Sequence, residues 1–243
     1  MSKTHKRGRL GNQIIRNLAL SILAEKYNLY AEYSSYDDIN NKLGIELFVG
    51  NKKYDKTVVV NNNNYMDYYN NNIKNDANFD FMKDFFQSEE ITTILYNHLN
   101  NKMINIINKN PYKERYKNNN DLFLHIRLGD AKEWNVGIEY YIHCINLLKY
   151  DYIYIGSDNL NDDLIKKIKA LYTNIILVDK NPIETIQFGS TCKNIILSHG
   201  SFSALIGYLG FFSNVYFMNT KPKNNWCLID MFLNKGFNPI NLK

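Results

Sequence analysis

The stretch Asp121-Leu-Phe-Leu-His-Ile-Arg-Leu-Gly-Asp130 decides the fold that is predicted for this chain. Its apolar run, Leu122–Ile126, alternates along the chain in the way that is typical of a buried β-strand. The run then breaks into a cation, Arg127, a glycine and a carboxylate, Asp130, which gain little from packing. At the carboxyl end of a parallel strand, these residues would lie where open α/β sheets bind ligands.

The sequence after this stretch alternates regularly between strand and helix patterns. Apolar runs at 152–155, 175–178, 194–197 and 215–218 predict strands, and helical periodicity predicts helices at 138–148, 160–171 and 182–188. A further helix is expected to run to about residue 210. Repeated βα units of this length predict a parallel, doubly wound sheet of the α/β class.

Three polar clusters each follow a predicted strand of this sheet. The clusters are His125 with Arg127 and Asp130, Ser157 with Asp158, and Ser198 with His199, Ser201 and Ser203. All carboxyl ends of a parallel sheet lie on one edge, so we expect the clusters to converge on one crevice. An arginine together with small hydroxyls predicts a nucleotide site.

Arg127 is the strongest candidate in that site. Its guanidinium presents a planar fork that holds a diphosphate bidentately, although a structural pair with Asp130 would also use it. His125 fits either a catalytic or an orienting role, and Asp130 fits either a general base or a brace for Arg127. Hydroxyls at a loop–helix junction, as at Ser201, serve equally as helix caps and as phosphate ligands.

The N-terminal half opens with Gly8-Arg-Leu-Gly-Asn-Gln13, followed by an amphipathic helix to about Tyr27. A glycine loop at a helix start favours an anion, so Gly11 and Asn12 are candidate phosphate or sugar contacts; an ordinary helix start is the alternative. The residues before the loop are too polar to predict a strand. Strands at 29–33 and 57–60 and helices at 80–99, broken near Ser88, and 102–108 are expected. The polar run 111–120 predicts a linker between domains 1–118 and 119–243.

Composition narrows the class of protein. The 243 residues carry a formal net charge of +5 and 22% charged residues, as in an ordinary globular protein, and the scattered lysines do not predict a nucleic-acid partner. No apolar run approaches the roughly 20 residues of a membrane span, and no signal peptide is expected. Cys144, Cys192 and Cys227 are widely spaced, which predicts reduced thiols and a cytoplasmic location and gives no metal spacing.

Five segments, in order, resemble the α-1,2-fucosyltransferases, inverting enzymes of the GT-B architecture that use GDP-fucose. They are Gly8-Arg-Leu-Gly-Asn-Gln13, Phe86-Gln-Ser-Glu89, His125-Ile-Arg-Leu-Gly-Asp130, Tyr154-Ile-Gly-Ser-Asp158 and Ser198-His-Gly-Ser-Phe-Ser203. The resemblance implies two Rossmann-like domains with the donor cleft between them, a GDP-sugar donor, a glycan acceptor, and neither a metal nor a cofactor. It also implies that Arg127 holds the β-phosphate. The other donor-binding residues would be Gly11, Asn12, Ser157, Asp158, Ser198, His199, Ser201, Phe202 and Ser203.

The chain departs from the family pattern at three places. Leu128 stands at the second arginine, His199 at an asparagine, and Ala204-Leu205 at two tryptophans. Two alternatives therefore stay open beside transfer to O2 of a galactose-like sugar. One is a transferase of the same fold with another donor or with a protein acceptor, as in protein O-fucosyltransferases. The other is an inactive module that binds a sugar nucleotide or a glycan.

Overall fold

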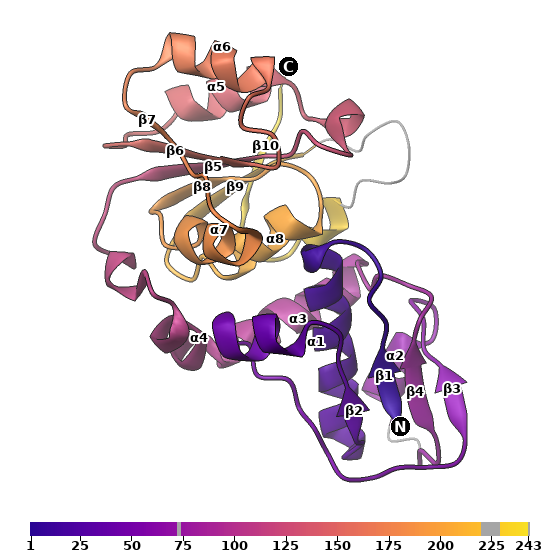
Figure 1. Cartoon of the computed structure of the whole chain (residues 1–243). Helices are drawn as coiled ribbons and strands as arrows, with labels where there is room; N and C mark the ends of the chain where they lie inside the picture. Colours follow the sequence, from indigo (N-terminus) through magenta and orange to yellow (C-terminus); the bar gives the residue numbers. More distant parts are fainter. Residues whose placement is uncertain (72–73, 220–228, 243) are drawn as a thin grey trace. The chain divides into compact units, whose positions relative to one another are not determined.

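The computed structural model describes residues 1–71, 74–219 and 229–242, so Cys227 lies outside the described residues. The chain divides into two compact units, Met1–Lys109 and Asn110–Lys243. Each unit has its own parallel sheet flanked by helices, as the ribbon in Figure 1 shows. The prediction of an α/β protein with two Rossmann-like domains is confirmed.

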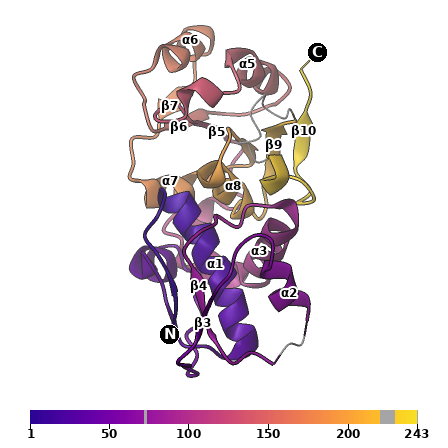
Figure 2. The ribbon, with the colours of Figure 1, turned by 90° about the vertical axis from the view of Figure 1, so that its right-hand side faces the viewer.

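The N-terminal unit is built on a four-stranded parallel sheet with the order β2-β1-β4-β3. Its helix α1 packs against the sheet and against α2 and α3, and every residue from Gln13 to Ala24 is buried. Figure 2 shows α1 running along the unit. The elements of this unit are β1 (Ser2–Thr4), α1 (Leu10–Tyr27), β2 (Ala31–Glu32), a π-helix (Asp37–Lys42), β3 (Thr57–Val59), α2 (Tyr65–Asn70), β4 (Asn78–Phe81), α3 (Glu89–Asn101) and α4 (Met103–Lys109).

Strand β1 corrects the expectation that the N-terminal residues are too polar for a strand. Ser2 and Thr4 are buried, but neighbours satisfy their hydroxyls. Ser2 Oγ accepts a hydrogen bond from Phe79 N at 2.9 Å, and Thr4 Oγ1 donates to Asn17 Oδ1 at 2.6 Å. Because a buried hydroxyl is costly only when it lacks a partner, a polar strand is stable at this position.

The predicted helix at 80–99 was wrong over its first part. Residues Asn78–Phe81 form strand β4, which pairs with β1 on one side and β3 on the other. The helix begins only at Glu89, where Ser88 acts as the N-cap and accepts a hydrogen bond from Ile91 N. A short apolar run bounded by polar residues fits a buried strand and a helix equally. Here the run forms a strand because it pairs with β1 and β3.

The C-terminal unit contains a six-stranded parallel sheet with the order β10-β9-β8-β5-β6-β7. Counted from β5, this is the 3-2-1-4-5-6 order of the Rossmann fold. Helices α5 and α6 cover one face and α7 and α8 the other (Figure 1). The elements are β5 (Leu122–Ile126), α5 (Ile138–Asn146), β6 (Ile153–Ser157), α6 (Asp163–Leu171), β7 (Ile175–Leu177), α7 (Pro182–Gly189), β8 (Asn194–Ile196), α8 (Ser201–Tyr208), β9 (Asn214–Met218) and β10 (Asn238–Ile240), with 3₁₀ turns at Lys113–Arg115, Lys132–Trp134 and Ile229–Met231.

Strand β10 and helix α2 were not predicted. Strand β10 contains Pro239 and lies at the edge of its sheet, where a residue without an N–H is tolerated. Helix α2 follows directly on a run of asparagines, which gave it the sequence pattern of a loop. Both elements are short, and neighbouring strands and helices, rather than a periodic pattern of their own, keep them in place.

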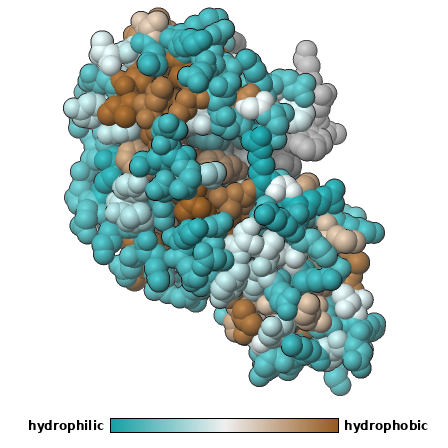
Figure 3. All heavy atoms as spheres, in the orientation of Figure 1, coloured by the Kyte–Doolittle hydropathy of each residue, from teal (hydrophilic) through white to brown (hydrophobic). Residues whose placement is uncertain are grey.

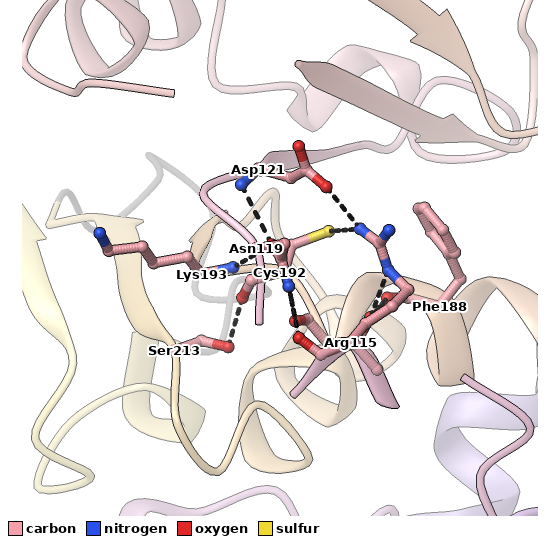
Figure 4. Close-up of polar contacts among 8 residues, drawn as sticks. Arg115, Asn119, Asp121, Phe188, Cys192, Lys193 and Ser213 are labelled. Atoms are coloured by element: carbon pink, nitrogen blue, oxygen red, sulfur yellow. Dashed lines mark hydrogen bonds and ion pairs between the residues drawn. The ribbon is translucent and has the colours of Figure 1, made fainter. Parts of the chain in front are cut away.

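The boundary between the units lies at Lys109/Asn110, nine residues before the predicted boundary at 118/119. The intervening segment is bound to the C-terminal unit, because Asn110 Nδ2 donates to Gln187 O at 2.9 Å. Figure 4 shows the continuation of this anchoring, in which Arg115 Nη2 contacts Asp121 Oδ2 at 2.7 Å and Cys192 Sγ at 3.7 Å. Asn119 also donates to Thr191 O at 2.9 Å.

The surface in Figure 3 is largely hydrophilic, with an apolar area beside β7, α5 and α6. The exposed apolar side chains of these elements include Ile176 and Leu171. Cys144 and Cys192 are free and buried, and burial raises the pKa of each thiol to about 12. Across the described part of the chain, no helix is both long and apolar enough to cross a membrane.

The Arg115–Asp121 pair provides a test of the anchoring. Arg115→Ala would leave the nearly buried Asp121 carboxylate without its cation, so the free energy of unfolding should fall by about 2 to 4 kcal/mol. The control is Lys166→Ala, which removes an exposed pair with Asp163 and should change the stability little, because solvent screens the pair. Urea unfolding measures both; equal losses would contradict the anchoring role.

Candidate functional site

The predicted residues of the C-terminal unit gather at the carboxyl edge of its sheet. The chain leaves β5 towards β6 and β7 on one side, and β8 to β10 lie on the other side. The topological switch point is therefore between β5 and β8, where doubly wound sheets bind ligands. Arg127 follows β5, and Ser198 follows β8 after Leu197; Arg127 N donates to Ser198 Oγ at 3.3 Å across this point.

The Arg127 guanidinium lies at the centre of the cluster. Its Nη2 donates to Asp130 Oδ1 at 3.1 Å, and its side chain is 24% exposed. Its Nη1 lies directly against Gly200, where an added Cβ would be 2.5 Å away; Gly200 also has φ +92°. Arg127 Nε is buried and has no hydrogen-bond partner among the described residues. The guanidinium is therefore held by packing on one side and partly open on the other.

Asp130 is 52% exposed and forms an ion pair with Arg127 three residues before it. Because the pair is half exposed, solvent screening keeps its contribution to stability small. The carboxylate thus stays accessible while it touches the arginine. This placement is compatible with both predicted roles, base and brace, and the assignment of Asp130 stays a prediction.

Two imidazoles flank the arginine. The pKa of His125 is lowered to about 4, and burial is the main cause. The Asp158 carboxylate opposes this shift, and the Arg127 cation adds to it. Burial and then Arg127 likewise lower the pKa of His199 to about 4. Both rings are therefore expected to be neutral at neutral pH, and Arg127 is the charged member of these three side chains. His125 is 5% exposed, and its Nδ1 is 2.9 Å from Ser203 Oγ.

The first turn of α8 supplies the remaining residues of the third cluster. Gly200 is the N-cap residue and makes no side-chain cap, and the first turn contains no acidic residue. Ser201 begins the helix, the Phe202 ring lies 5.1 Å from the His125 ring, and Ser203 contacts His125. The structure thus brings His125, Arg127, Asp130, Ser198, His199, Phe202 and Ser203 together.

The second predicted cluster makes internal contacts. Asp158 Oδ1 accepts hydrogen bonds from the amides of Leu128 at 2.8 Å and Gly129 at 2.9 Å. A Cβ on Gly129 would be 2.4 Å from Asp158 Oδ2, so a larger residue here would push the Asp158 carboxylate out of its present position. Ser157 Oγ accepts from Asn159 N at 3.1 Å. Nucleotide binding by Ser157 and Asp158 stays a prediction.

Leu128 occupies a buried position that does not suit an arginine. The side chain is 2% exposed and packs in the core formed by β5, β6, α5 and α6. An arginine there would bury a cation among apolar groups, which is costly without a paired anion. Leu128 therefore serves the core, and Arg127 faces the edge of the sheet.

Two residues of this region were missed by sequence reasoning. Asn135 Nδ2 donates to Arg127 O at 3.0 Å and to Tyr141 OH at 3.4 Å. An asparagine shortly before Gly137 is typical of a loop, and a tyrosine at a core position of helix α5 gives no separate signal. Only the fold brings both to Arg127.

Gly11 and Asn12 belong to the N-terminal unit, at the start of α1. Asn12 Oδ1 accepts from Gln87 Nε2 at 2.7 Å, which joins the first and second of the five segments. The buried Arg16 holds the same loops, because its Nε donates to Asp84 O at 3.0 Å and its Nη1 to His5 O at 2.9 Å. The two predicted residues therefore lie at a carboxyl edge of their own sheet, and their contact with a sugar nucleotide stays a prediction.

Comparison with known proteins gives similarities of fold. No protein-family profile and no curated protein sequence matches the chain. The chain is similar to the α-1,6-fucosyltransferase NodZ co-crystallised with GDP, at 13% identity and TM-score 0.40, over 63% of this chain and 58% of that one. NodZ comes from Bradyrhizobium. A NodZ crystal soaked with GDP-fucose gives 14% identity and TM-score 0.37, over 61% and 57%.

The E. coli heptosyltransferase WaaC with ADP is similar over 98% of this chain and 90% of its own, at 11% identity and TM-score 0.46. The chain spans about 58% of the length of NodZ. Identities of this size concern the fold alone, so the roles of individual residues rest on the geometry above. Within residues 1–71, 74–219 and 229–242, no group of three His, Cys, Asp or Glu residues could hold a metal ion.

The buried imidazole of His125 should make stability depend on pH. Its pKa is about 4 in the folded chain and about 6.5 when unfolded, so the unfolded state binds more protons between these values. The stability that it contributes is present above pH 6.5 and is lost as the pH falls through 4, by up to about 3 kcal/mol.

His125→Asn should lose stability less steeply than the unchanged chain between pH 6.5 and 4, measured by urea unfolding. His143→Asn, at an exposed position of helix α5, is the matched control for the exchange of a histidine for an asparagine. An unchanged slope in the His125 variant would contradict the assignment of a neutral, buried imidazole.

Proposed function

We propose that this chain is a glycosyltransferase of GT-B architecture that binds a GDP-sugar at the carboxyl edge of its C-terminal unit. GDP-fucose is the proposed sugar donor, and a hydroxyl of a glycan, O2 of a galactose-like sugar, is the proposed acceptor. The activity is proposed to be inverting and independent of metal. The resemblance of the five segments supports the donor class and the order of the two domains.

The observation that carries the proposal is the placement of Arg127. Its guanidinium lies at the β5/β8 switch point, is 24% exposed, and is flanked by two neutral imidazoles. Such a group is suited to a diphosphate, because each hydrogen bond between charged partners contributes roughly 1.5–3 kcal/mol. The half-exposed Asp130 is a weak competitor for it.

The proposed reaction uses these groups in a single displacement. The acceptor hydroxyl attacks the anomeric carbon of fucose, and the bond from that carbon to the β-phosphate oxygen breaks on the opposite side. Arg127 stabilises the negative charge that grows on the departing GDP. The hydroxyl proton passes to a carboxylate, for which Asp130 is the candidate.

Arg127→Ala should abolish transfer and weaken GDP binding by tenfold or more, because the charge and the hydrogen-bonding fork are both lost. Arg127→Lys keeps the charge without the fork and should recover only part of the binding. Isothermal titration calorimetry with GDP measures both variants. Lys166→Ala removes one exposed positive charge on α6 and should bind GDP like the unchanged chain. Undiminished transfer by Arg127→Ala would overturn the assignment.

Asp130→Asn separates the two roles of the carboxylate. If Asp130 is the base, the variant should bind GDP normally and lose transfer by a hundredfold or more. If Asp130 is only a brace for Arg127, both GDP binding and transfer should weaken together. Transfer of radiolabelled fucose from GDP-fucose, beside calorimetry, measures the two quantities.

A panel of nucleotide sugars tests the donor itself through the melting temperature. A ligand at 100 times its dissociation constant adds about 2.7 kcal/mol of stability. Stabilisation by GDP and GDP-fucose is expected, and stabilisation by other nucleotides alone would show that the donor is wrong. GDP binding without transfer to any glycan or folded protein domain would favour an inactive binding module.

A further inference from the structure

The peptide units around Arg127 are held on both sides by side chains from other segments. Arg127 N donates to Ser198 Oγ at 3.3 Å, after strand β8. Arg127 O accepts from Asn135 Nδ2 at 3.0 Å, from the loop before helix α5. Arg127 thus has a fixed backbone, although its side chain has few polar contacts.

Tyr141 extends these contacts into helix α5. Asn135 Nδ2 donates to the Tyr141 hydroxyl at 3.4 Å. A chain of contacts therefore runs from Tyr141 through Asn135 to Arg127 O. Tyr141 is fully buried, so water does not replace its hydroxyl easily. Burial raises the pKa of Tyr141, and the phenol stays protonated and able to donate.

Asp158 holds the backbone that follows. Its Oδ1 accepts from the amides of Leu128 and Gly129, at 2.8 and 2.9 Å. One carboxylate oxygen thus binds two consecutive backbone amides immediately after Arg127. The absence of a Cβ at Gly129 lets the carboxylate approach this closely.

We propose that Asn135, Tyr141 and Asp158 are positioning residues that aim the Arg127 guanidinium by holding its backbone. The inference rests on the proposed function, since it concerns how Arg127 meets a diphosphate. The guanidinium itself is held by packing against Gly200 and by one half-exposed ion pair. The direction of the guanidinium therefore depends mainly on the position of the Arg127 backbone. An error of about 1 Å at a binding group weakens its contacts strongly.

A pair of adjacent tyrosines on α5 provides a matched test. Tyr140 and Tyr141 are both fully buried, and each variant to Phe removes one hydroxyl. The Tyr140 hydroxyl donates to Leu197 O at 3.0 Å and to Tyr216 O at 3.3 Å, outside the chain of contacts from Tyr141 to Arg127. Tyr141→Phe should weaken GDP binding about tenfold in calorimetry, and Tyr140→Phe should leave it within twofold. Urea unfolding of both variants measures the common cost of losing a buried hydroxyl.

Asn135→Ala gives a second measurement at a loop position, where the fold is less sensitive. It should weaken GDP binding by a similar factor, and the double variant with Tyr141→Phe should bind no worse than about tenfold below the unchanged chain. Independent effects that multiply in the double variant would contradict a single chain of contacts from Tyr141 through Asn135 to Arg127. Asp158→Asn keeps an oxygen for the two amides, so Asp158→Ala should weaken GDP binding more than Asp158→Asn does.

These outcomes separate the two proposals. Failure of the unchanged chain to bind GDP would overturn the proposed function. Normal GDP binding by the unchanged chain, with equal binding by Tyr140→Phe and Tyr141→Phe, would overturn the positioning role and leave the function standing. A loss in Asp158→Asn as large as in Asp158→Ala would assign the Asp158 charge, rather than its backbone contacts, to binding.

Discussion

The burial of strand β5 between β6 and β8 is the constraint on which the C-terminal unit depends. All five of its residues are buried, and it pairs in parallel register with a neighbour on each side. A parallel strand in this position needs apolar side chains on both faces and helices over both. After β5, the chain adds β6 and β7 on one side of this strand and then β8, β9 and β10 on the other side. The polar residues after β5 consequently meet those after β8.

Electrostatics at this edge follow from the same burial. Two imidazoles are withdrawn from water beside a guanidinium, and desolvation and charge repulsion both favour their neutral forms. An arginine keeps its charge under these conditions, because its pKa is far above the neutral range. Of these three side chains, Arg127 is the one that keeps its positive charge in the neutral range.

The interior of the N-terminal unit contains polar residues, and each of these needs hydrogen-bond partners. The hydroxyls of β1 are satisfied by Phe79 N and by Asn17. The guanidinium of Arg16 is fully buried and donates to main-chain carbonyls of the loops after β1 and β4; burial lowers its pKa. It also lies over the Phe85 ring, 5.0 Å from the centroid, which offers a favourable face for a cation. Backbone carbonyls and an aromatic face are its direct contacts, and the nearby Asp84 carboxylate opposes the lowering of its pKa.

The sequence by itself determined the α/β class, the βα alternation after residue 121, and the polar strand ends that supply Arg127 and its neighbours. These follow from local periodicity, which a chain carries wherever it lies. It did not determine β1, β4 or β10. Ser2 and Thr4 suit a strand only when Phe79 N and Asn17 lie beside them, and the run at Asn78 fits a helix until β1 and β3 enclose it.

The tertiary structure alone decided the partners within the site. Asp158 contacts the amides of Leu128 and Gly129, and Ser198 and Asn135 contact the main chain of Arg127, because register and strand order bring these residues together. Hydrogen bonds between residues far apart in sequence leave no periodic trace. The sequence therefore predicted which types of residue lie at the edge of the sheet. Which of these residues contact one another was determined by the fold.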